Sequence, residues 1–352
     1  MLLALLVKLA VVGVTLAESG WRPDPLTAVS TAWAQWDARH YIALATHGYQ
    51  AGGDARNLIA FLPLYPGLTH LLSMAGLPPA LGVLLISNVA GVVAAILLYE
   101  IARGEGDESS AFRAAALFTI FPTAYFLLVG YTEALFCALT FGAVLLSRRR
   151  RWLSAGVLGG LAAATRLTGL ALIPFLAVEL VTGRAPLRHL WRALASPLLV
   201  AAGFCAYLGI NLAVTGNALT FVTVQRQHWS HSLAAPWVGF AEAIRGISWR
   251  APWEKLTVGA GEMAGGIAAF ATATLSWLRL RPSDAAYATA ATVMVTFLPF
   301  WLSIPRYLLS IYPLFLLAGR LRNTWLYRGL LAASFLSLLG LASAFIAGYW
   351  AF

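Results

Sequence analysis

The chain contains few charged residues for its length. Of its 352 residues only 11% are charged, whereas 60% are hydrophobic, and the mean hydropathy is +0.76. Soluble domains carry about 25% charged residues, so this composition excludes an ordinary water-soluble fold. It predicts a polytopic, all-α membrane protein whose helices face lipid.

Cysteine is also scarce. The two thiols, Cys137 and Cys205, lie within apolar stretches, which argues against a disulfide framework and against a thiolate metal centre. His228 and His231 share a helical spacing but have no acid nearby, so we expect no metal site and no cofactor. The sequence also lacks a P-loop, a GxGxxG turn and an HExxH motif, and nucleotide-driven or zincin-type chemistry is therefore not expected.

Acidic residues are outnumbered, with 14 acids against 24 basic residues and a net charge of +10. The basic residues form short clusters between apolar spans instead of one long basic face, so we expect no nucleic-acid partner. The clusters are Arg148-Arg149-Arg150-Arg151, then Arg184, Arg188 and Arg192, then Arg279 and Arg281, and then Arg320, Arg322 and Arg328. The positive-inside rule places all four in the cytoplasm.

Apolar stretches long enough to cross a bilayer recur along the chain, and we expect about eleven transmembrane helices. They lie near residues 2–18, 81–102, 111–129, 133–147, 153–165, 167–182, 193–214, 257–278, 285–302, 307–319 and 329–350. An even number of spans then separates successive arginine clusters, and the N-terminus is cytoplasmic. The first stretch is interpreted as an uncleaved helix instead of a signal peptide, because Lys8 interrupts it and no small-x-small site follows.

Two long connections remain within a single domain of residues 1–352, and the predicted topology places both outside the cytoplasm. They are residues 19–80 and 215–256, and function should concentrate there. Residues 58–76 look long enough to span, but a full span would place the four-arginine run outside. We therefore expect an interfacial or re-entrant segment, consistent with Pro63 and Pro66.

Residues 33–49 predict an amphipathic helix that lies in the membrane interface. Its aromatic and apolar side is formed by Trp33, Trp36, His40, Ile42, Ala43 and Leu44. Residues 221–237 are similarly rich in aromatic and polar groups, and we expect His228 and His231 to hydrogen-bond with lipid or substrate there.

Two acids on the predicted outer side are candidates for chemistry. Asp37 has nothing obviously structural to cap, although it could equally be a surface carboxylate paired with Arg39 or His40. Glu133 lies at the outer mouth between two spans, where it could act on substrate or only favour the start of the next helix.

Two arginines lie at outer helix ends. Arg166 separates two apolar halves and should have an anionic partner, because an unpaired guanidinium near hydrocarbon is costly. Arg306 has a similar place. Snorkelling to the interface is the alternative for both side chains.

Several short motifs occur in the order typical of the PIG-V-like mannosyltransferases. They are Trp36-Asp37-Ala38-x-His40-Tyr41, Gly48-Tyr49, Phe61-Leu62-Pro63-Leu64-Tyr65-Pro66, Phe121-Pro122, Tyr131-Thr132-Glu133-Ala134-Leu135-Phe136, residues 166–169 and 225–229, and Pro305-Arg306-Tyr307-Leu308-Leu309 with Pro313. The chain thus resembles relatives of the eukaryotic enzyme that adds the second mannose to the GPI anchor, within the GT-C superfamily. It is shorter than the eukaryotic members, which favours a prokaryotic relative with another acceptor.

The resemblance implies a GT-C fold and an inverting transfer from a polyprenyl-phosphate sugar to a lipid-linked or glycan acceptor. It implies Asp37 as the catalytic base, and Arg166, Arg306 and His40 as groups that bind the donor phosphate. The residues expected to contact substrate are Trp36, Arg39, Tyr41, Tyr65, Tyr131, Glu133, Gln225, His228 and Tyr307.

Three other functions are compatible with the sequence. An enzyme of this fold that moves another sugar, such as glucose or aminoarabinose, has the same motifs. A transporter or lipid flippase should show an inverted repeat and acids at the bilayer midplane. We find no repeat and expect the acids to crowd the outer side. Glu262, near the outer half of its predicted span, is the one residue that favours a transporter. A scaffold would leave the Asp37 and arginine arrangement without a purpose.

Overall fold

The computed structural model describes residues 2–18, 25–183 and 190–352, and every regular element within them is a helix. This part confirms the predicted all-α class. Arg184 and Arg188 of the second basic cluster lie outside the described residues. Three helices of the described chain, α5 (Pro79–Arg103), α10 (Leu190–Thr215) and α18 (Thr324–Ile346), are long and apolar enough to cross a membrane. The number of eleven crossings stays a prediction.

The remaining helices are shorter. In chain order they are α1 (Leu2–Glu18), α2 (Pro25–Trp33), α3 (Asp37–His47), α4 (Leu64–Met74), α6 (Glu108–Ile120), α7 (Glu133–Arg148), α8 (Trp152–Ala163), α9 (Leu172–Thr182), α11 (Thr220–Trp229), α12 (Pro236–Trp249), α13 (Pro252–Glu254), α14 (Glu262–Arg279), α15 (Pro282–Thr296), α16 (Ile304–Tyr307) and α17 (Pro313–Gly319). Short 3-10 turns and one π-helical turn link them, at Asp54–Ala60, Ala124–Leu127, Leu167–Ala171, Lys255–Gly261 and Leu308–Ser310.

Local sequence sets where these helices begin and end. The stretch predicted at 81–102 is α5, which starts at a proline, where a missing N–H costs nothing, and has Arg103 in its last turn, where a cation suits the helix dipole. α6 begins after Asp107, whose carboxylate accepts from Ser110 N at 2.7 Å. α18 begins after Asn323 in the same way.

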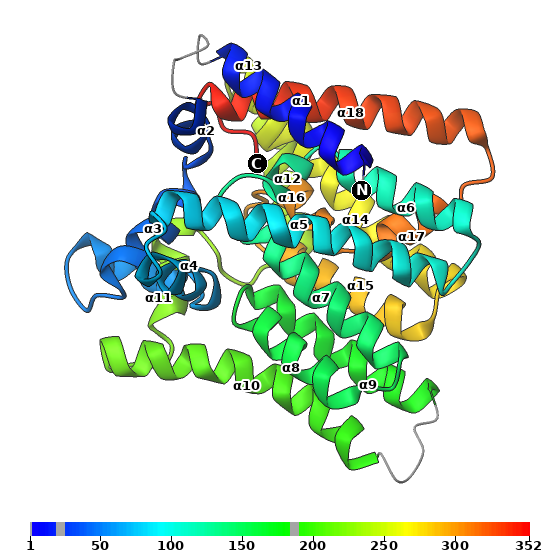
Figure 1. Ribbon diagram of the computed structural model, residues 1–352, viewed down its shortest axis with the longest axis horizontal. Coiled ribbons are helices and arrows are strands. Elements are labelled where there is room, and N and C mark those ends of the chain that lie inside the picture. Colours follow the sequence, from blue (N-terminus) through cyan, green and yellow to red (C-terminus); the bar gives the residue numbers. More distant parts are fainter. Residues whose placement is uncertain (1, 19–24, 184–189) are drawn as a thin grey trace.

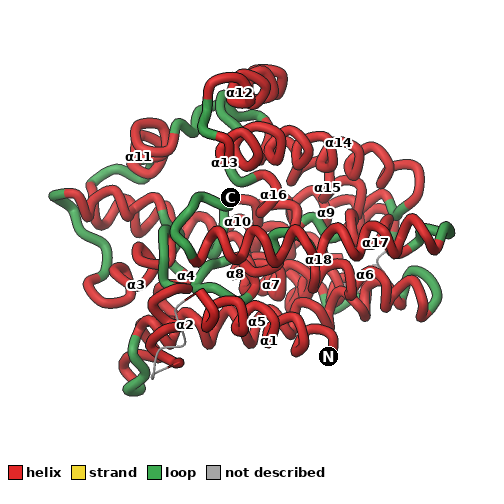
Figure 2. Tube along the Cα trace, turned by 90° about the horizontal axis from the view of Figure 1, so that it is seen from above, coloured by secondary structure: helices red, strands yellow, loops and turns green. Residues whose placement is uncertain are grey.

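The long helices run in nearly the same direction across the molecule (Figure 1). α3, α4 and α11 gather at one end, on the left of that view, while Figure 2 shows α1 and α5 on the side opposite α12 and α14. α7 links the two ends through the interior. Its first residue, Glu133, and its last, Arg148, are about 22 Å apart at the usual rise per residue.

Close helix packing accounts for much of the interior. Around α7 the core is aromatic, and Phe118 and Phe141 meet edge to face with their ring centres 5.7 Å apart. α8 and α10 approach through glycines, because a side chain added at Gly203 would collide with the backbone of Gly160. Small residues of this kind let membrane helices pack closely without hydrophobic driving force.

Three of the arginine clusters meet at the end opposite α3, which we call the arginine end. Arg320 Nη1 donates to the carbonyl of Arg279 at 2.7 Å, and Arg148 Nη2 lies 2.6 Å from Asp284 Oδ1. Glu105 is also buried there. The expectation that the acids crowd the other end was therefore wrong in part, since acids accompany the arginine clusters and neutralise them.

The expected helix over residues 33–49 is interrupted. α2 ends at Trp33, which is 3% exposed and donates its indole N–H to Thr15 Oγ1 at 2.8 Å, so it does not belong to an interfacial aromatic face. α3 starts only at Asp37, after Trp36 turns the chain with φ +52°. In the 58–76 segment the helix α4 has 11 residues, about 16 Å, too short for a full crossing.

Candidate functional site

Asp37 is placed by the start of α3. Its backbone N–H donates to the Tyr131 hydroxyl at 3.3 Å, and that hydroxyl lies 3.3 Å from the carbonyl of Gln35. Tyr131 thereby fixes both sides of the strained turn at Trp36. The Asp37 side chain is 25% exposed, so its carboxylate remains accessible from outside the protein.

A chain of four ionic groups runs inward from Asp37. Arg306 Nη1 lies 3.2 Å from Asp37 Oδ2, and Arg306 Nε lies 2.9 Å from Glu133 Oε1. Arg166 contacts the same Glu133 oxygen and donates to Thr132 Oγ1 at 2.8 Å. In this order the side chains are 25%, 10%, 3% and 11% exposed, so the three groups behind Asp37 are largely buried.

The structure thus brings together residues that are far apart in the sequence. The expectation that Arg166 has an anionic partner is confirmed, and the partner is Glu133. The alternative in which Asp37 pairs with Arg39 or His40 is not what the structure shows, because its carboxylate pairs with Arg306. Neither arginine is a snorkelling anchor, since both side chains are largely buried among ion pairs.

Arg306 is held by the turn that carries it. Glu262 is fully buried, and its two carboxylate oxygens accept from Ser303 N at 2.5 Å and Ile304 N at 2.8 Å, at the start of α16. Thr123 donates to the carbonyl of Pro305 at 2.9 Å. Glu262, which gave the transporter hypothesis its support, is therefore occupied in capping α16.

Aromatic rings lie against both guanidinium groups. The Arg306 guanidinium carbon is 5.2 Å from the Phe126 ring centre and 5.3 Å from that of Tyr131. The Arg166 carbon is 4.7 Å from the Tyr307 ring centre. Cation–π contacts of this kind stabilise a cation that has lost most of its water. Tyr131 and Tyr307, both expected to contact substrate, thus belong to the charged cluster.

A second aromatic group lies beside the cluster. The Phe61 ring packs against the rings of His40 and Tyr41, with ring centres 5.0 and 5.2 Å apart. The Trp229 ring of α11 also packs on Phe61, with ring centres 5.7 Å apart. Tyr65 is fully buried behind them, with its hydroxyl 2.8 Å from both Val83 O and Ser87 Oγ, so it supports α5 from within. Burial raises the pKa of Tyr41, which keeps its phenol protonated.

The segment after α11 supplies further polar groups. Gln225 Nε2 donates to the carbonyl of Ala60 at 3.5 Å, a long bond, and Gln225 Oε1 lies 2.8 Å from His231 Nδ1. Burial, with a smaller contribution from Arg306, lowers the pKa of His231, so the ring is neutral near pH 7. His228 is exposed and its ring is 5.9 Å from that of Trp229.

Two of the expected substrate residues lie at the surface. Arg39 is exposed on α3, and Trp36 is 40% exposed with its ring edge-on to Trp350 at 5.4 Å. Neither side chain belongs to the ionic chain. Within residues 2–18, 25–183 and 190–352 no group of three or more histidine, cysteine or acidic side chains is arranged to hold a metal ion.

The electrostatics of the cluster follow from its composition. Two guanidiniums and two carboxylates alternate, so their formal charges cancel and burial is tolerated. Glu133 Oε2 is buried without a hydrogen-bond partner, so one acceptor is unused between the two arginines. Asp37, at the accessible end, combines a carboxylate able to accept a proton with a neighbouring guanidinium able to bind an oxyanion.

Sequence reasoning missed several residues that shape this site. Thr132 and Phe126 contact the two arginines, and Glu262 orders the backbone of Arg306. A signal existed for Glu262, because a lone acid in a glycine-rich apolar stretch requires a partner. No local pattern distinguishes Phe126 from its apolar neighbours.

Comparison of the sequence with known proteins identifies a family. The family described as Mannosyltransferase (PIG-V) matches residues 27–228. GPI alpha-1,6-mannosyltransferase 2 of Rattus norvegicus is 36% identical over 174 residues, which cover 46% of this chain and 34% of the relative. The Homo sapiens protein of the same name is 32% identical over 204 residues, covering 52% and 40%. The match thus spans about a third to two fifths of these relatives' length.

Among solved structures, the chain resembles the crystal structure of the Archaeoglobus fulgidus oligosaccharyltransferase tethered with an acceptor peptide. The two are 12% identical, and the superposition covers 99% of this chain and 55% of the other. Its TM-score of 0.48 is too low to assign a fold. The family match, by contrast, covers more than half of the chain and includes Asp37, Glu133 and Arg166, and the chain therefore belongs to the mannosyltransferase (PIG-V) family.

Proposed function

We propose that this protein is an inverting mannosyltransferase that moves mannose from a polyprenyl-phosphate donor to a lipid-linked or glycan acceptor. The observation that carries the proposal is the accessible Asp37 carboxylate at the head of a buried chain of paired charges. The buried, alternating acidic and basic side chains hold the Asp37 carboxylate in one position, which a catalytic base requires. Family membership and the names of the relatives support mannose as the sugar.

The proposed reaction is a single displacement. The acceptor hydroxyl oxygen attacks the anomeric carbon while the bond from that carbon to the phosphate oxygen breaks. Asp37 takes the hydroxyl proton, and the polyprenyl phosphate departs with the bonding electrons. Because no covalent enzyme intermediate forms, a β-linked donor gives an α-mannoside.

The departing phosphate gains negative charge and needs a cation. Arg306 is the guanidinium nearest to Asp37, and it can bind phosphate oxygens in a bidentate manner while it stays paired with Glu133. Arg166 lies one step further inward and offsets Glu133 from the other side. We assign donor-phosphate binding to Arg306, with Arg166 and His40 in support.

The rest of the expected substrate contacts form the walls of this arrangement. Tyr131, Tyr307 and Glu133 belong to the ionic cluster, and Tyr41 and Gln225 belong to the neighbouring aromatic group. Sugars stack on aromatic faces and hydrogen-bond to amides, so this wall suits a hexose. Trp36 and Arg39 lie beside Asp37 in the sequence, and His228 lies in the last turn of α11. All three are exposed and suit contact with an acceptor.

We place the reaction on the extracytoplasmic side of the membrane, in a multi-pass protein. The supporting observation is that Asp37 and three arginine clusters lie at opposite ends of α7, so the positive-inside rule assigns the Asp37 end to the outside. Exposed apolar side chains along α5, α10 and α18, such as Val89, Leu198 and Leu336, suit contact with lipid between the two ends.

The test is a transfer assay with purified protein in lipid vesicles. Polyprenyl-phosphate mannose and the corresponding glucose donor, each radiolabelled in the sugar, are supplied with a native lipid extract. Mannose transfer is expected, and Asp37→Asn should reduce it about 10²–10⁴-fold, because the amide keeps the shape but cannot accept the proton. Asp54→Asn, an exposed acid in the same loop, is the matched control and should transfer normally.

Each alternative has its own outcome in this assay. Glucose transfer without mannose transfer would assign another sugar to the same site. Less than a tenfold loss in Asp37→Asn would remove Asp37 from the catalytic role. Donor crossing the vesicle without product would identify a transporter and overturn the proposal.

A further inference from the structure

A pocket of 340 Å³ lies at the arginine end, between the last turns of α5 and α7. Five of its lining side chains are charged, and four of these are arginines: Arg103, Arg148, Arg149, Arg281 and Glu100. Ile101 and Leu145 supply apolar lining. None of these residues belongs to the proposed active site, which lies at the other end of α7.

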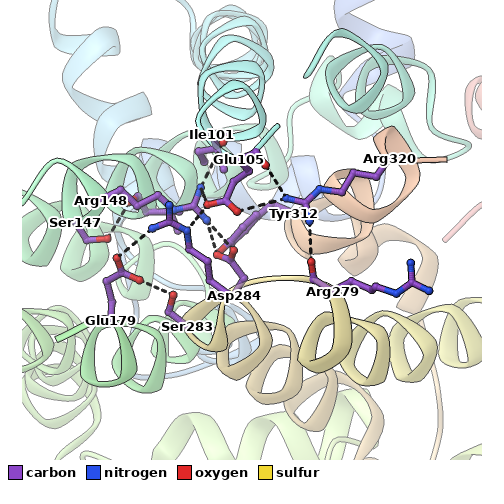
Figure 3. A network of polar contacts seen from close by, with 12 residues as sticks. Ile101, Glu105, Ser147, Arg148, Glu179, Arg279, Ser283, Asp284, Tyr312 and Arg320 are labelled. Atoms are coloured by element: carbon purple, nitrogen blue, oxygen red, sulfur yellow. Dashed lines mark hydrogen bonds and ion pairs between the residues drawn. The ribbon is translucent and has the colours of Figure 1, made fainter. Parts of the chain in front are cut away.

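Two of the lining residues, Arg148 and Arg281, belong to an ion network that is already balanced. Arg148 Nη2 lies 2.6 and 2.8 Å from the two Asp284 carboxylate oxygens, and Arg320 Nη2 lies 3.4 Å from Glu105 Oε2 (Figure 3). Arg281 Nε lies 2.5 Å from Glu105 Oε1. The network comprises three cations and three acids: Arg148, Arg281, Arg320, Glu105, Glu179 and Asp284. Their formal charges cancel, so the network adds no net charge to the pocket.

The mouth of the pocket has excess positive charge. Arg103 Nη2 and Arg149 Nη2 share a single carboxylate oxygen, Glu100 Oε2, at 2.9 and 3.7 Å. Their side chains are 56% and 57% exposed, so the two guanidiniums have free N–H groups at the surface. In addition, Arg148 Nε is buried without a hydrogen-bond partner, although its side chain is only 9% exposed.

An apolar track leads along α5 to this mouth. Its exposed members lie on one face at spacings of three or four residues, and Glu100 and Arg103 continue the same face: Leu85, Val89, Val93 and Ile96. The first and last positions of this series are 18 residues apart, which is five full helical turns. A molecule with a long apolar chain and an anionic head would contact the track and the mouth at once.

We propose that the pocket binds the phosphate group of an anionic phospholipid, with its acyl chains along the exposed face of α5. The phosphate oxygens accept hydrogen bonds from Arg103 and Arg149, and from Arg148 Nε at the base of the mouth. Basic pockets between membrane helices on the positively charged side are suited to such headgroups. Glu100 sets the strength of binding, because it neutralises one of the two rim arginines.

The test measures lipid retention by native mass spectrometry. The full-length protein is placed in nanodiscs of phosphatidylcholine and phosphatidylglycerol with the same acyl chains, and the phosphatidylglycerol fraction that gives half occupancy is determined. Phosphatidylglycerol should be retained in preference to phosphatidylcholine. The double variant Arg103→Gln/Arg149→Gln should need about 30-fold more phosphatidylglycerol, from roughly fivefold per surface arginine.

Two further variants separate the pocket from general electrostatics. Arg322→Gln/Arg328→Gln removes the same charge from exposed arginines of the same end that do not line the pocket, and retention should stay close to that of the unaltered protein. Glu100→Gln should increase retention, by about fivefold. Equal loss in both double variants, or equal retention of the two lipids by the unaltered protein, would overturn the proposal.

A final arm distinguishes lipid from free phosphate. Excess inorganic phosphate should not release phosphatidylglycerol, since it has no acyl chains to lie along α5. Release by inorganic phosphate would assign the pocket to a soluble anion and would overturn the lipid assignment.

Discussion

Arg306 and Asp37 are 269 residues apart in the sequence, yet Arg306 Nη1 lies 3.2 Å from Asp37 Oδ2. The same guanidinium contacts Glu133 through Nε. Arg306 therefore connects the proposed base to the buried acid. It serves two purposes in the proposed reaction, because it orients the carboxylate before the donor arrives and binds the phosphate afterwards.

The first prediction concerns Arg306. Replacement by alanine should lower transfer efficiency by about 10–150-fold, because a charge-assisted hydrogen bond contributes about 1.5–3 kcal/mol. Arg306→Lys should recover only part of this loss, since a point charge replaces a planar fork. The measurement is kcat/KM for the polyprenyl-phosphate donor.

Arg56→Ala, which changes an exposed arginine in the first outer loop, is the control and should behave as the unaltered protein. Near-normal transfer in Arg306→Ala with reduced thermal stability would make Arg306 a structural residue only.

The second prediction concerns Glu133. Glu133→Gln leaves Arg166 and Arg306 facing each other without the carboxylate that separates them, and breaking a buried ion pair typically costs about 3–5 kcal/mol. We expect a marked fall in the thermal unfolding temperature in detergent. Glu108→Gln, which also removes an acid from the first turn of a helix but at an exposed position, is the control. The double variant Glu133→Gln/Arg166→Met should regain part of the loss, and no regain would show that the pair is not coupled.

The third prediction is a pH dependence. Burial and the nearby Arg306 lower the pKa of His231 below its usual value of 6.5. A lowered pKa in the folded state means that the unfolded state binds the proton first, so stability should fall as pH drops below about 6.5. The measurement compares unfolding temperatures at about pH 7.5 and about pH 5. His231→Gln should show a smaller decrease, whereas an unchanged decrease would place the titrating group elsewhere.

The fourth prediction tests the topology. With Cys137 and Cys205 replaced by alanine, Gly52→Cys should react with a membrane-impermeant maleimide on intact cells, and Arg150→Cys should not. Both positions are exposed, so a difference in reaction reports the side of the membrane and not burial. The reverse pattern would move the proposed reaction to the cytoplasm.

Some helix positions could be predicted from the sequence, because certain apolar stretches end at residues with clear physical preferences. Others differ, since the stretch predicted at 111–129 is helical only to Ile120 in α6 and the one at 307–319 is divided among short helical turns. The stretch predicted at 133–147 is α7, which extends from Glu133 to Arg148, with an acid at its start and a base at its end. The break between α2 and α3 could not be predicted in this way. It rests on a positive φ at Trp36, and neither glycine nor proline marks it.

The identities of the site residues could be predicted, but their pairings could not. Asp37, Glu133, Arg166 and Arg306 stood out as charges beside apolar segments, and the structure joins all four. Which acid meets which base depends on how distant helices pack, and a single sequence contains no record of that. The network around Glu105 left a weaker signal. Glu179 and Asp284 lie close to Arg184 and Arg281 in the sequence, but Glu105 lies near none of the four arginine clusters.

The order in which the four charged groups appear during synthesis has a consequence for assembly. Asp37, Glu133 and Arg166 belong to the first half of the chain, whereas Arg306 lies 140 positions beyond Arg166. At about 5–20 residues per second, a ribosome needs roughly 7–28 s to cover that distance. Throughout that interval the nascent cluster carries two carboxylates and one guanidinium. The excess negative charge disfavours closure of the outer helices until the segment with Arg306 arrives, so the site is completed last.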